Sequence, residues 1–498
     1  MTKLRGLFQF SKRPAPERKP ATPGLESDLA HSHNKRDPEE NRESCPPSDE
    51  HIDVHCIWVV ELYLPSHLDQ LTAGFQALEW AAPNGMVDRE GLEQWIQDAT
   101  SRLYGTAWKN LNIITRPGDD RFQLFSRSAP LPNVVDYARG SIHYIFPGLV
   151  GVVLQFVLKD DPARCLESEL RCDRKTFARP HGRGWSFITP FHQKTQGCQE
   201  AREALRQACA SWFRSHLPGF FASLGDQAHF PTGEFIMFEK GQPYLRLPNR
   251  GWADYLRILQ MDHDFDAWYS KSLPGIRLGC GSRGESSALA LTFATREDEF
   301  FANDTEDNWR SYGGRNREGY TNRLSDLERT VAVWAVHALL TNLEGQVAAL
   351  WNRVAAIDLS SVSQAAAQLE SVQADLLTVT RDALPLASEL KHFCEKPAMF
   401  HVEVYEFLPA SQARSNDPPL FEGLRETLSR RAGLLEELAR EIRDAAAREG
   451  SLVATMSQDR ATKTTIRLNL VLSVLTGVLV VLTGALVALS ILWLLRPP

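Results

Sequence analysis

Residues 56–64 read CIWVVELYL and give the clearest indication of how this chain folds. Eight of these nine residues are apolar and Glu61 alone is charged, which is typical of a strand covered on both faces of a sheet. The next residues, SHLDQLTAGFQALEW (66–80), begin with a serine suited to cap a helix and repeat apolar residues at helical spacing. The sequence therefore predicts a buried strand that leads into a helix.

Strand and helix patterns mix irregularly from residue 51 to about residue 310. Helical spacing occurs in DREGLEQWIQDATSRLYG (88–105) and CQEAREALRQACASWFRSH (198–216). Strand-like runs occur in SIHYIFPGLVGVVLQFVL (141–158), EFIMFE (234–239) and ALALTFA (288–294). Because no regular strand–helix–strand repeat appears, we predict an α+β globular domain over residues 51–310, built as one unit or as two subdomains that meet near residue 200.

The next part of the chain, residues 320–465, has the spacing of long helices. Apolar residues follow steps of three and four at Leu340, Leu343, Val347, Leu350 and Val354, and similar steps recur over 369–379 and 424–442. Such seams are typical of a helical bundle or a coiled-coil-like stalk. Packing within one chain and pairing between chains are both compatible with the pattern.

Residues 1–50 have a different composition. The runs KRPAPERKPATPG (12–24) and HNKRDPEENRESCPPSDE (33–50) are rich in proline and charge and poor in residues that form a core. We therefore expect a disordered tail over 1–50. Its start has no apolar run long enough for a secretory signal, so we expect the large N-terminal portion to stay in the cytoplasm.

Residues 468–495, LNLVLSVLTGVLVVLTGALVALSILWLL, contain no charged residue. A helix of this length is about 42 Å long, more than the roughly 30 Å hydrocarbon core of a bilayer. Arg460, Lys463 and Arg467 precede the stretch, whereas Arg496 alone follows it. Since positive charge gathers on the cytoplasmic side, the sequence predicts a single-pass, tail-anchored membrane protein whose N-terminal domain is cytoplasmic.

Polar and small residues gather on one face of this apolar stretch. Steps of seven or of three and four place them together, and this face comprises Asn469, Ser473, Thr476, Gly477, Thr483, Gly484 and Ser490. Small residues allow close approach of two membrane helices, and hydroxyls can bond between them, so we expect self-association into a homo-oligomer. In one alternative, the hydroxyls bond to carbonyls of their own helix. In another, they line a narrow polar path through an oligomer.

Composition restricts the classes of function. The net charge of −7 argues against a nucleic-acid partner, and eight cysteines without zinc-ligand spacing argue against a zinc site or a disulfide scaffold. GCGSRG (279–284) fits a dinucleotide-binding pattern, but the residues after it resemble a strand rather than the required helix. We therefore predict no catalytic residue, no metal ligand and no cofactor.

Two glycine-containing loops, RPHGRGW (179–185) and WRSYGGRNREGY (309–320), interleave arginine with aromatic residues. Arginine forms two parallel hydrogen bonds with phosphate or carboxylate, and aromatic rings offer flat surfaces for stacking. Either loop can bind an anionic small molecule or an acidic partner protein, or can simply be a solvated loop. The candidate ligand-binding residues are Arg179, Arg183, Trp185, Arg310, Tyr312, Arg315 and Arg317.

Together these features favour a non-enzymatic sensor, adaptor or effector in the cytoplasm, tethered to the lipid bilayer and self-associating through its helical region and membrane helix. A homo-oligomeric pore or ion channel with a hydroxyl-lined membrane helix is one alternative. A membrane-tethered enzyme with dispersed site residues in 51–310 is another.

Overall fold

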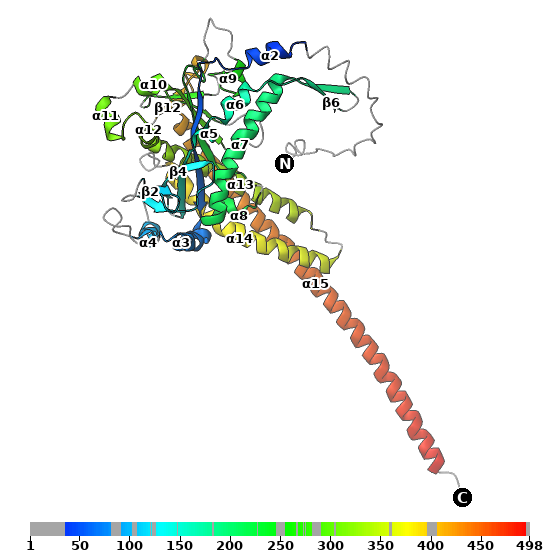
Figure 1. Cartoon of the computed structure of the whole chain (residues 1–498). Helices are drawn as coiled ribbons and strands as arrows, with labels where there is room; N and C mark the ends of the chain where they lie inside the picture. The colour runs from blue at the N-terminus through cyan, green and yellow to red at the C-terminus, as the bar shows by residue number, and fades with distance from the viewer. Residues whose placement is uncertain are drawn as a thin grey trace.

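The computed structural model describes residues 35–80, 91–101, 107–119, 121, 126–146, 148–181, 184–226, 228–245, 254–264, 267–271, 273, 275–280, 290–302, 305–357, 361–395 and 406–494. Most of the chain forms a domain around one large mixed sheet, and a long helix runs outward from it (Figure 1). The expected combination of strands and helices in the N-terminal part is therefore confirmed.

The large sheet has ten strands in the order β12-β9-β10-β11-β8-β1-β5-β4-β2-β3. All neighbouring strands are antiparallel except the pairs β8–β11 and β2–β3, which are parallel. The bounds are β1 Ile52–Tyr63, β2 Ala107–Thr115, β3 Ser126–Ser128, β4 Val135–Phe146, β5 Leu149–Leu158, β8 Thr232–Phe238, β9 Ala267–Ser270, β10 Arg277–Cys280, β11 Ala290–Arg296 and β12 Phe407–Pro409.

Strand β1 lies in the middle of this sheet and contains most of the stretch CIWVVELYL. It pairs with β5 on one side, where Val59 is opposite Leu154, and with β8 on the other, where Ile57 is opposite Glu234. Every residue from 54 to 63 is buried. The prediction of a strand covered on both faces is confirmed.

Helices cover both faces of the sheet. On β8 the side chains of adjacent residues point to opposite faces. Glu234 contacts Arg202 of α7 (Pro190–His216), and a Cβ atom added to Gly233 would lie 3.0 Å from Val331 of α13 (Leu327–Ala355). Helices α7 and α13 therefore lie on opposite sides, and glycine at 233 allows α13 to approach the sheet closely.

The remaining helices are short or belong to the layer that contains α13. Their bounds are α2 Asp37–Glu43, α3 Leu68–Ala77, α4 Leu92–Ser101, α5 Asp160–Ala163, α6 Cys165–Arg171, α8 Phe220–Ser223, α9 Asp254–Ile258, α10 Glu297–Ala302, α11 Glu306–Ser311, α12 Arg317–Arg323, α14 Val362–Glu395 and α15 Leu420–Leu494. Three short 3₁₀ turns occupy Pro65–His67, Leu324–Asp326 and Gln412–Arg414.

The predicted helical region packs onto the α+β region in one continuous core. Helices α13, α14 and α15 pack against one another, and their apolar residues share a cluster with those of the sheet. Strand β12 lies between α14 and α15 in the sequence and forms the edge of the sheet beside β9. The boundary expected near residue 310–320 therefore does not separate two cores. Coiled-coil pairing between chains stays a prediction.

The structure differs from the expected tail at residues 37–50. Here α2 packs beside α7, and Ser44 and Glu50 are buried. The Asp37 carboxylate accepts hydrogen bonds from the backbone N–H and the hydroxyl of Thr176, at 2.9 and 2.6 Å. These polar contacts fix a segment that has few apolar residues of its own, which is why composition alone predicted disorder. Residues 1–34 lie outside the described residues.

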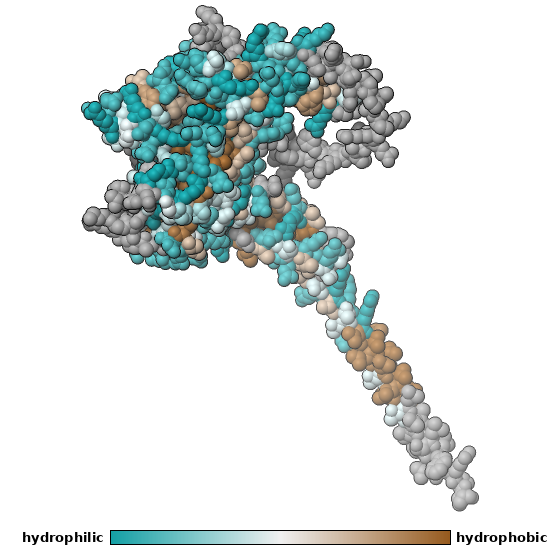
Figure 2. Space-filling view, viewed as in Figure 1, coloured by the Kyte–Doolittle hydropathy of each residue, from teal (hydrophilic) through white to brown (hydrophobic). Residues whose placement is uncertain are grey.

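Helix α15 begins inside the domain and continues far beyond it (Figure 1). Its first half is buried at positions such as Leu428, Leu435 and Ile442, and Val453 is the last buried position up to residue 481. From residue 454 to residue 481 the helix is exposed, apart from the partly exposed Met456, and Figure 2 shows apolar residues of this part as a brown band outside the mostly teal domain. By length and composition, α15 is able to cross a membrane.

A row of polar side chains joins β1 and β4 to α12. The Tyr137 hydroxyl lies 3.0 Å from the Thr321 hydroxyl, and His55 Nε2 lies 3.2 Å from the same oxygen. Arg139 donates to the side-chain oxygen of Asn322 at 2.9 Å. Because hydrogen bonds are directional, this row fixes the position of α12 on the sheet more specifically than apolar contacts would.

The same row continues to α13 through Ser141 and His143. The Ser141 hydroxyl donates to the Glu328 carboxylate and lies 2.8 Å from His143 Nε2. Burial lowers the pKa of His143 to about 4, with a further contribution from the positive charge of Arg329. Since serine, rather than histidine, joins the other two groups and all three are buried, the arrangement differs from a catalytic triad and is structural.

We expect Leu428→Ala to lower the free energy of unfolding by about 2–5 kcal/mol, because the truncation leaves a cavity where α15 packs in the core. Leu434 on the same helix is 57% exposed, so Leu434→Ala should change the free energy of unfolding by less than about 0.5 kcal/mol. Urea unfolding of the detergent-solubilised full chain, followed by tryptophan fluorescence, measures both. Equal effects would contradict the burial of this face.

We also expect acid to destabilise the protein through His143. Its folded pKa is lowered, so below pH 6.5 the unfolded chain binds a proton that the folded chain does not, and stability falls until about pH 4. Between pH 7 and pH 4.5, the free energy of unfolding of His143→Gln should therefore fall by about 2 kcal/mol less than that of wild type. Identical pH profiles for wild type and His143→Gln would refute this role.

Candidate functional site

The two predicted arginine–aromatic loops lie on different sides of the domain. Residues 306–323 form α11 and α12, and the other loop forms a ribbon of two strands, β6 (Phe177–His181) and β7 (Gly184–Ile188). Figure 1 shows α11 and α12 on the left of the domain and β6 projecting on the right. A single small anion therefore cannot contact both loops.

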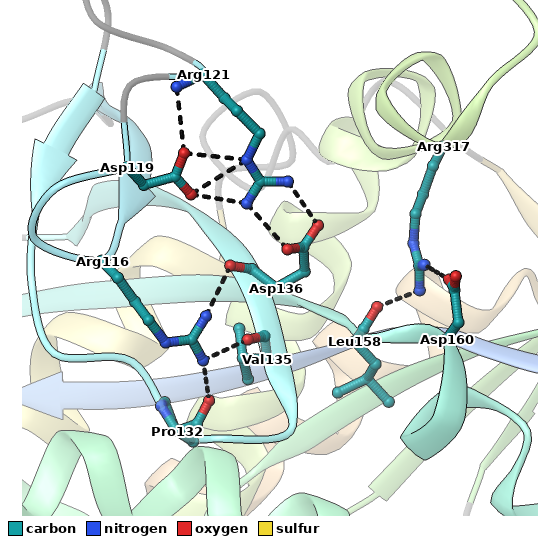
Figure 3. Close-up of polar contacts among 9 residues, drawn as sticks. All are labelled: Arg116, Asp119, Arg121, Pro132, Val135, Asp136, Leu158, Asp160 and Arg317. Atoms are coloured by element: carbon teal, nitrogen blue, oxygen red, sulfur yellow. Dashed lines mark hydrogen bonds and ion pairs between the residues drawn. The ribbon is translucent and has the colours of Figure 1, made fainter.

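Internal contacts occupy most of the arginines of the α11–α12 loop. Arg317 forms an ion pair with Asp160 and donates to the carbonyl of Leu158 at the end of β5 (Figure 3). Arg315 lies over the ring of Phe301, 5.6 Å from its centroid, and 3.3 Å from a carboxylate oxygen of Glu306.

The remaining predicted residues of this loop, Arg310 and Tyr312, also have partners. The Tyr312 hydroxyl accepts a hydrogen bond from Arg323 at 3.0 Å, and the Arg323 guanidinium lies over the Tyr312 ring. Arg310 is highly exposed and lies 3.6 Å from Asp307. The structure therefore gives this loop a role in fixing α12 against the sheet.

The glycines of this loop explain the pattern that suggested a binding site. Gly313 and Gly314 have φ angles of +103° and +99°, which side chains rarely adopt. A Cβ atom on Gly319 would lie 1.8 Å from the carbonyl oxygen of Gly314, so only glycine fits there. A tight turn requires these residues whether or not a ligand binds.

Two further arginines near the start of β4 are structural as well (Figure 3). Arg116 donates to three carbonyl oxygens within residues 132–136, at 2.6, 2.6 and 3.3 Å. Arg121 forms ion pairs with Asp119 and Asp136, at 2.7 and 2.9 Å. These contacts hold together the loops at one end of the sheet.

The β6–β7 ribbon carries the remaining predicted residues. Its strands pair antiparallel, with Arg179 opposite Ser186 and Pro180 opposite Trp185. Arg179 is exposed, and no described residue forms an ion pair with it. Trp185 is partly exposed and belongs to the opposite face of the ribbon, because pairs alternate in direction. Arg183 lies outside the described residues.

A cleft of about 890 Å³ lies between α2 and the segment that leads into β6. Basic residues predominate among its charged lining, which comprises Arg42, Arg171, Arg174, Lys175, Asp37 and Asp173. Arg171 is fully engaged: it pairs with Glu167 and donates to backbone carbonyls before β1, including that of Glu50 at 2.8 Å. Lys175 is exposed and has no ion-pair partner among the described residues. Arg174 also forms an ion pair, with Glu169.

Sequence reasoning missed the residues that hold this region together. Lys194 is buried and donates to the carbonyls of Asn41 and Leu170, at 3.3 and 2.7 Å, near the C-terminal ends of α2 and α6. Burial lowers the pKa of its ammonium group. The signal for α2 was available in the sequence: Asp37, Pro38 and two glutamates suit the first turn of a helix.

The predicted association face of the membrane helix is open. Asn469, Ser473, Thr476, Gly477 and Thr483 are exposed on α15. The hydroxyls of both threonines donate to carbonyls four residues earlier in the same helix, at 2.8 and 2.7 Å. For these two threonines, the structure has the alternative arrangement, in which the hydroxyl bonds within its own helix. The surroundings of Gly484 and Ser490 lie outside the described residues, and self-association stays a prediction.

Other chemistry has little support in the described part of the chain. There, no three histidine, cysteine, aspartate or glutamate side chains are placed to hold a metal ion. No protein-family model matches the sequence, and no curated protein is significantly similar to it.

We expect Asp37→Ala to release α2 from the base of the ribbon, because the variant loses both hydrogen bonds to Thr176. Limited proteolysis of the full chain should then cleave within residues 35–50 at least several-fold faster than in wild type. Glu39 lies on the same helix but is exposed, so Glu39→Ala should retain the wild-type rate. Similar rates in all three proteins would contradict this docking.

Proposed function

We propose that this protein is a single-pass membrane protein that holds a non-enzymatic adaptor or sensor domain in the cytoplasm. One observation carries the proposal: α15 is a single helix that packs in the core of the domain at one end and is apolar enough to cross a bilayer at the other. A flexible linker would only tether the domain, whereas a continuous helix couples the domain to the membrane segment.

The exposed part of α15 supports this arrangement. Between Val453, its last buried residue, and Leu468, where the apolar stretch begins, lie 14 residues of exposed or partly exposed helix. At about 1.5 Å per residue, this spacer is roughly 21 Å long. The domain would therefore stand clear of the bilayer surface, with room for a partner on its sides.

The charges of the spacer support the cytoplasmic orientation. Arg460, Lys463 and Arg467 are exposed and lie on the domain side of the apolar stretch, and Lys463 pairs with Asp459 at 2.6 Å. Lysine and arginine next to a membrane helix favour the cytoplasmic side. Their position three and four residues apart places all three on one face of the helix, where they can contact anionic headgroups together.

The open ribbon supports an adaptor or sensor rather than an enzyme. Binding surfaces for proteins are exposed, whereas catalytic sites usually bury a substrate in a pocket with convergent polar groups. In the described residues, the buried polar clusters, such as Ser141 with Glu328, are enclosed between the sheet and α13. Self-association through α15 would allow several such domains to cluster.

Membrane fractionation tests the proposed function. Full-length protein should stay in the membrane pellet after alkaline carbonate extraction, and a protein truncated before Arg460 should be soluble. Replacement of Leu475, Val478 and Leu479 by arginine should also release the protein, because each charge costs about 3 kcal/mol near the bilayer centre. The control carries three arginines on the spacer, at Thr455, Gln458 and Thr462, and should stay in the pellet.

Two results would contradict the proposal. One is recovery of full-length protein in the soluble fraction without detergent. The other is digestion of the domain by protease added outside sealed cells, which would place the domain on the wrong side of the membrane.

A further inference from the structure

We propose that Cys45 and Cys172 form a redox-active pair, which a peroxide converts to a disulfide that fastens α2 to the end of α6. The inference goes beyond the proposed function and assigns a modification site beside the cleft. Three observations carry it: the register of α2 along the segment before β6, a buried ammonium group that interacts with both cysteines, and the accessibility of both side chains.

Paired contacts run antiparallel between α2 and the segment before β6. Asp37 accepts hydrogen bonds from Thr176, at 2.9 and 2.6 Å. One helical turn later, the Asn41 side chain donates to the carbonyl of Arg174 at 2.7 Å and accepts from its N–H at 2.9 Å. Four residues of helix and two residues of extended chain each advance by roughly 6 Å. The next step of this register therefore reaches the two cysteines.

A further contact closes the register on the other side of the cysteines. Arg171 directly precedes Cys172 in the sequence. Its guanidinium donates to the carbonyls of the two prolines that directly follow Cys45, at 3.5 and 3.1 Å. Hydrogen bonds thus connect the two segments both before and after the cysteines. This bracketing holds the segments next to each other at the position where the two thiols occur.

A buried ammonium group joins the two segments at the same place. Lys194 donates to the carbonyls of Asn41 and Leu170, at 3.3 and 2.7 Å, so the ends of α2 and α6 meet at one nitrogen. Burial lowers the pKa of Lys194, and the negative charges that Cys45 and Cys172 carry as thiolates are among the effects that oppose this shift. Both thiols therefore lie near the same ammonium group.

Accessibility distinguishes this pair from two neighbouring cysteines. Cys45 is partly exposed and lines the cleft, Cys172 is exposed, and both are free thiols in this structure. Cys198, one helical turn after Lys194 on α7, is buried, and burial raises its pKa to about 12. Burial also raises the pKa of Cys165, to about 11. Because the thiolate is the form that reacts with an oxidant, burial disfavours reaction at these two neighbours.

The reaction balances with hydrogen peroxide as the oxidant. The thiolate of Cys172, the more exposed of the two, attacks one peroxide oxygen, the O–O bond breaks, and hydroxide leaves, so the sulfur becomes a sulfenic acid. The Cys45 thiolate then attacks this sulfur, an S–S bond forms, and the sulfenic oxygen leaves as hydroxide. The two thiol protons convert both hydroxides to water, and the two electrons lost by the thiols reduce the peroxide. A dithiol reductant reverses the change by thiol–disulfide exchange.

The disulfide would change how α2 is held. In the thiol form, hydrogen bonds of Asp37, Asn41 and Lys194 fix this helix. The disulfide would add a covalent bond beside them and close a loop from residue 45 to residue 172. In a reducing compartment such bonds are transient and serve redox sensing rather than permanent stabilisation. The state of the pair would therefore set whether α2, and the cleft that it lines, is able to open.

Mass spectrometry of the full-length protein in detergent tests the pair. The reduced protein is treated with hydrogen peroxide, its remaining thiols are blocked with N-ethylmaleimide, and it is digested without reductant. A peptide pair joined through Cys45 and Cys172 should be the main product, and dithiothreitol should remove it. A main product that joins either cysteine to Cys198 or to a second copy of the chain would overturn the proposal, as would equal oxidation of all eight cysteines.

Serine variants assign the role of each cysteine. Cys45→Ser should form no disulfide and should accumulate Cys172 as a sulfenic acid, which dimedone labels. Cys172→Ser should lose both the disulfide and most of this label. Cys165→Ser, at the start of α6, is the matched control and should form the disulfide at the wild-type rate. Loss of the disulfide in this control, or equal dimedone labelling of the first two variants, would contradict the assignment.

Limited proteolysis tests the fastening of α2. Asp37→Ala is expected to be cleaved faster within residues 35–50, and peroxide should slow that cleavage at least several-fold until dithiothreitol restores it. The double variant Asp37→Ala, Cys45→Ser should not respond to peroxide. The same cleavage rate with and without the disulfide would overturn the fastening. Carbonate extraction should be identical for the oxidised and reduced protein, so failure of the disulfide leaves the proposed membrane function standing.

Discussion

The structure depends on the need to cover a sheet whose central strands are apolar on both faces. β1 is buried along almost its whole length, and neither face of β8 is left to solvent: Glu234 meets Arg202 on one side, and Gly233 admits α13 on the other. Because α13 supplies one of the two covering layers, the helical region is part of the domain. Removing it would expose the centre of the sheet, at a cost proportional to the apolar area returned to water.

This covering layer also holds the helix that is able to cross a membrane. Helix α15 packs against α13 and α14, so its start is fixed by the same core that holds the sheet. The polar contacts of Thr321 and Glu328 fix α12 and α13 in one register on β4. Packed elements therefore connect the sheet to α15, and α15 continues as one helix to its apolar end.

Much of this architecture was predictable from the sequence because it depends on local periodicity. The run CIWVVELYL predicted β1, and helical spacing predicted the long helices. The uncharged stretch after residue 467 predicted the helix that can cross a membrane. Long-range contacts were not predictable. The arginines at 315 and 317 have the residue types of an anion site, but their partners, Phe301, Glu306 and Asp160, are brought to them only by the fold. The docking of α2 likewise depends on Thr176, a residue 139 positions away.

In a bilayer crossed by α15, the unbroken course of this helix would also impose a rotational phase between the domain and the membrane. Each residue of an α-helix advances the chain by about 1.5 Å and turns it by about 100°. One residue inserted into the exposed spacer would therefore swing the β6–β7 ribbon by more than a quarter turn around the membrane normal, whereas seven inserted residues would bring it back almost to its starting azimuth. The length of the spacer would thus set the direction in which the domain faces along such a membrane.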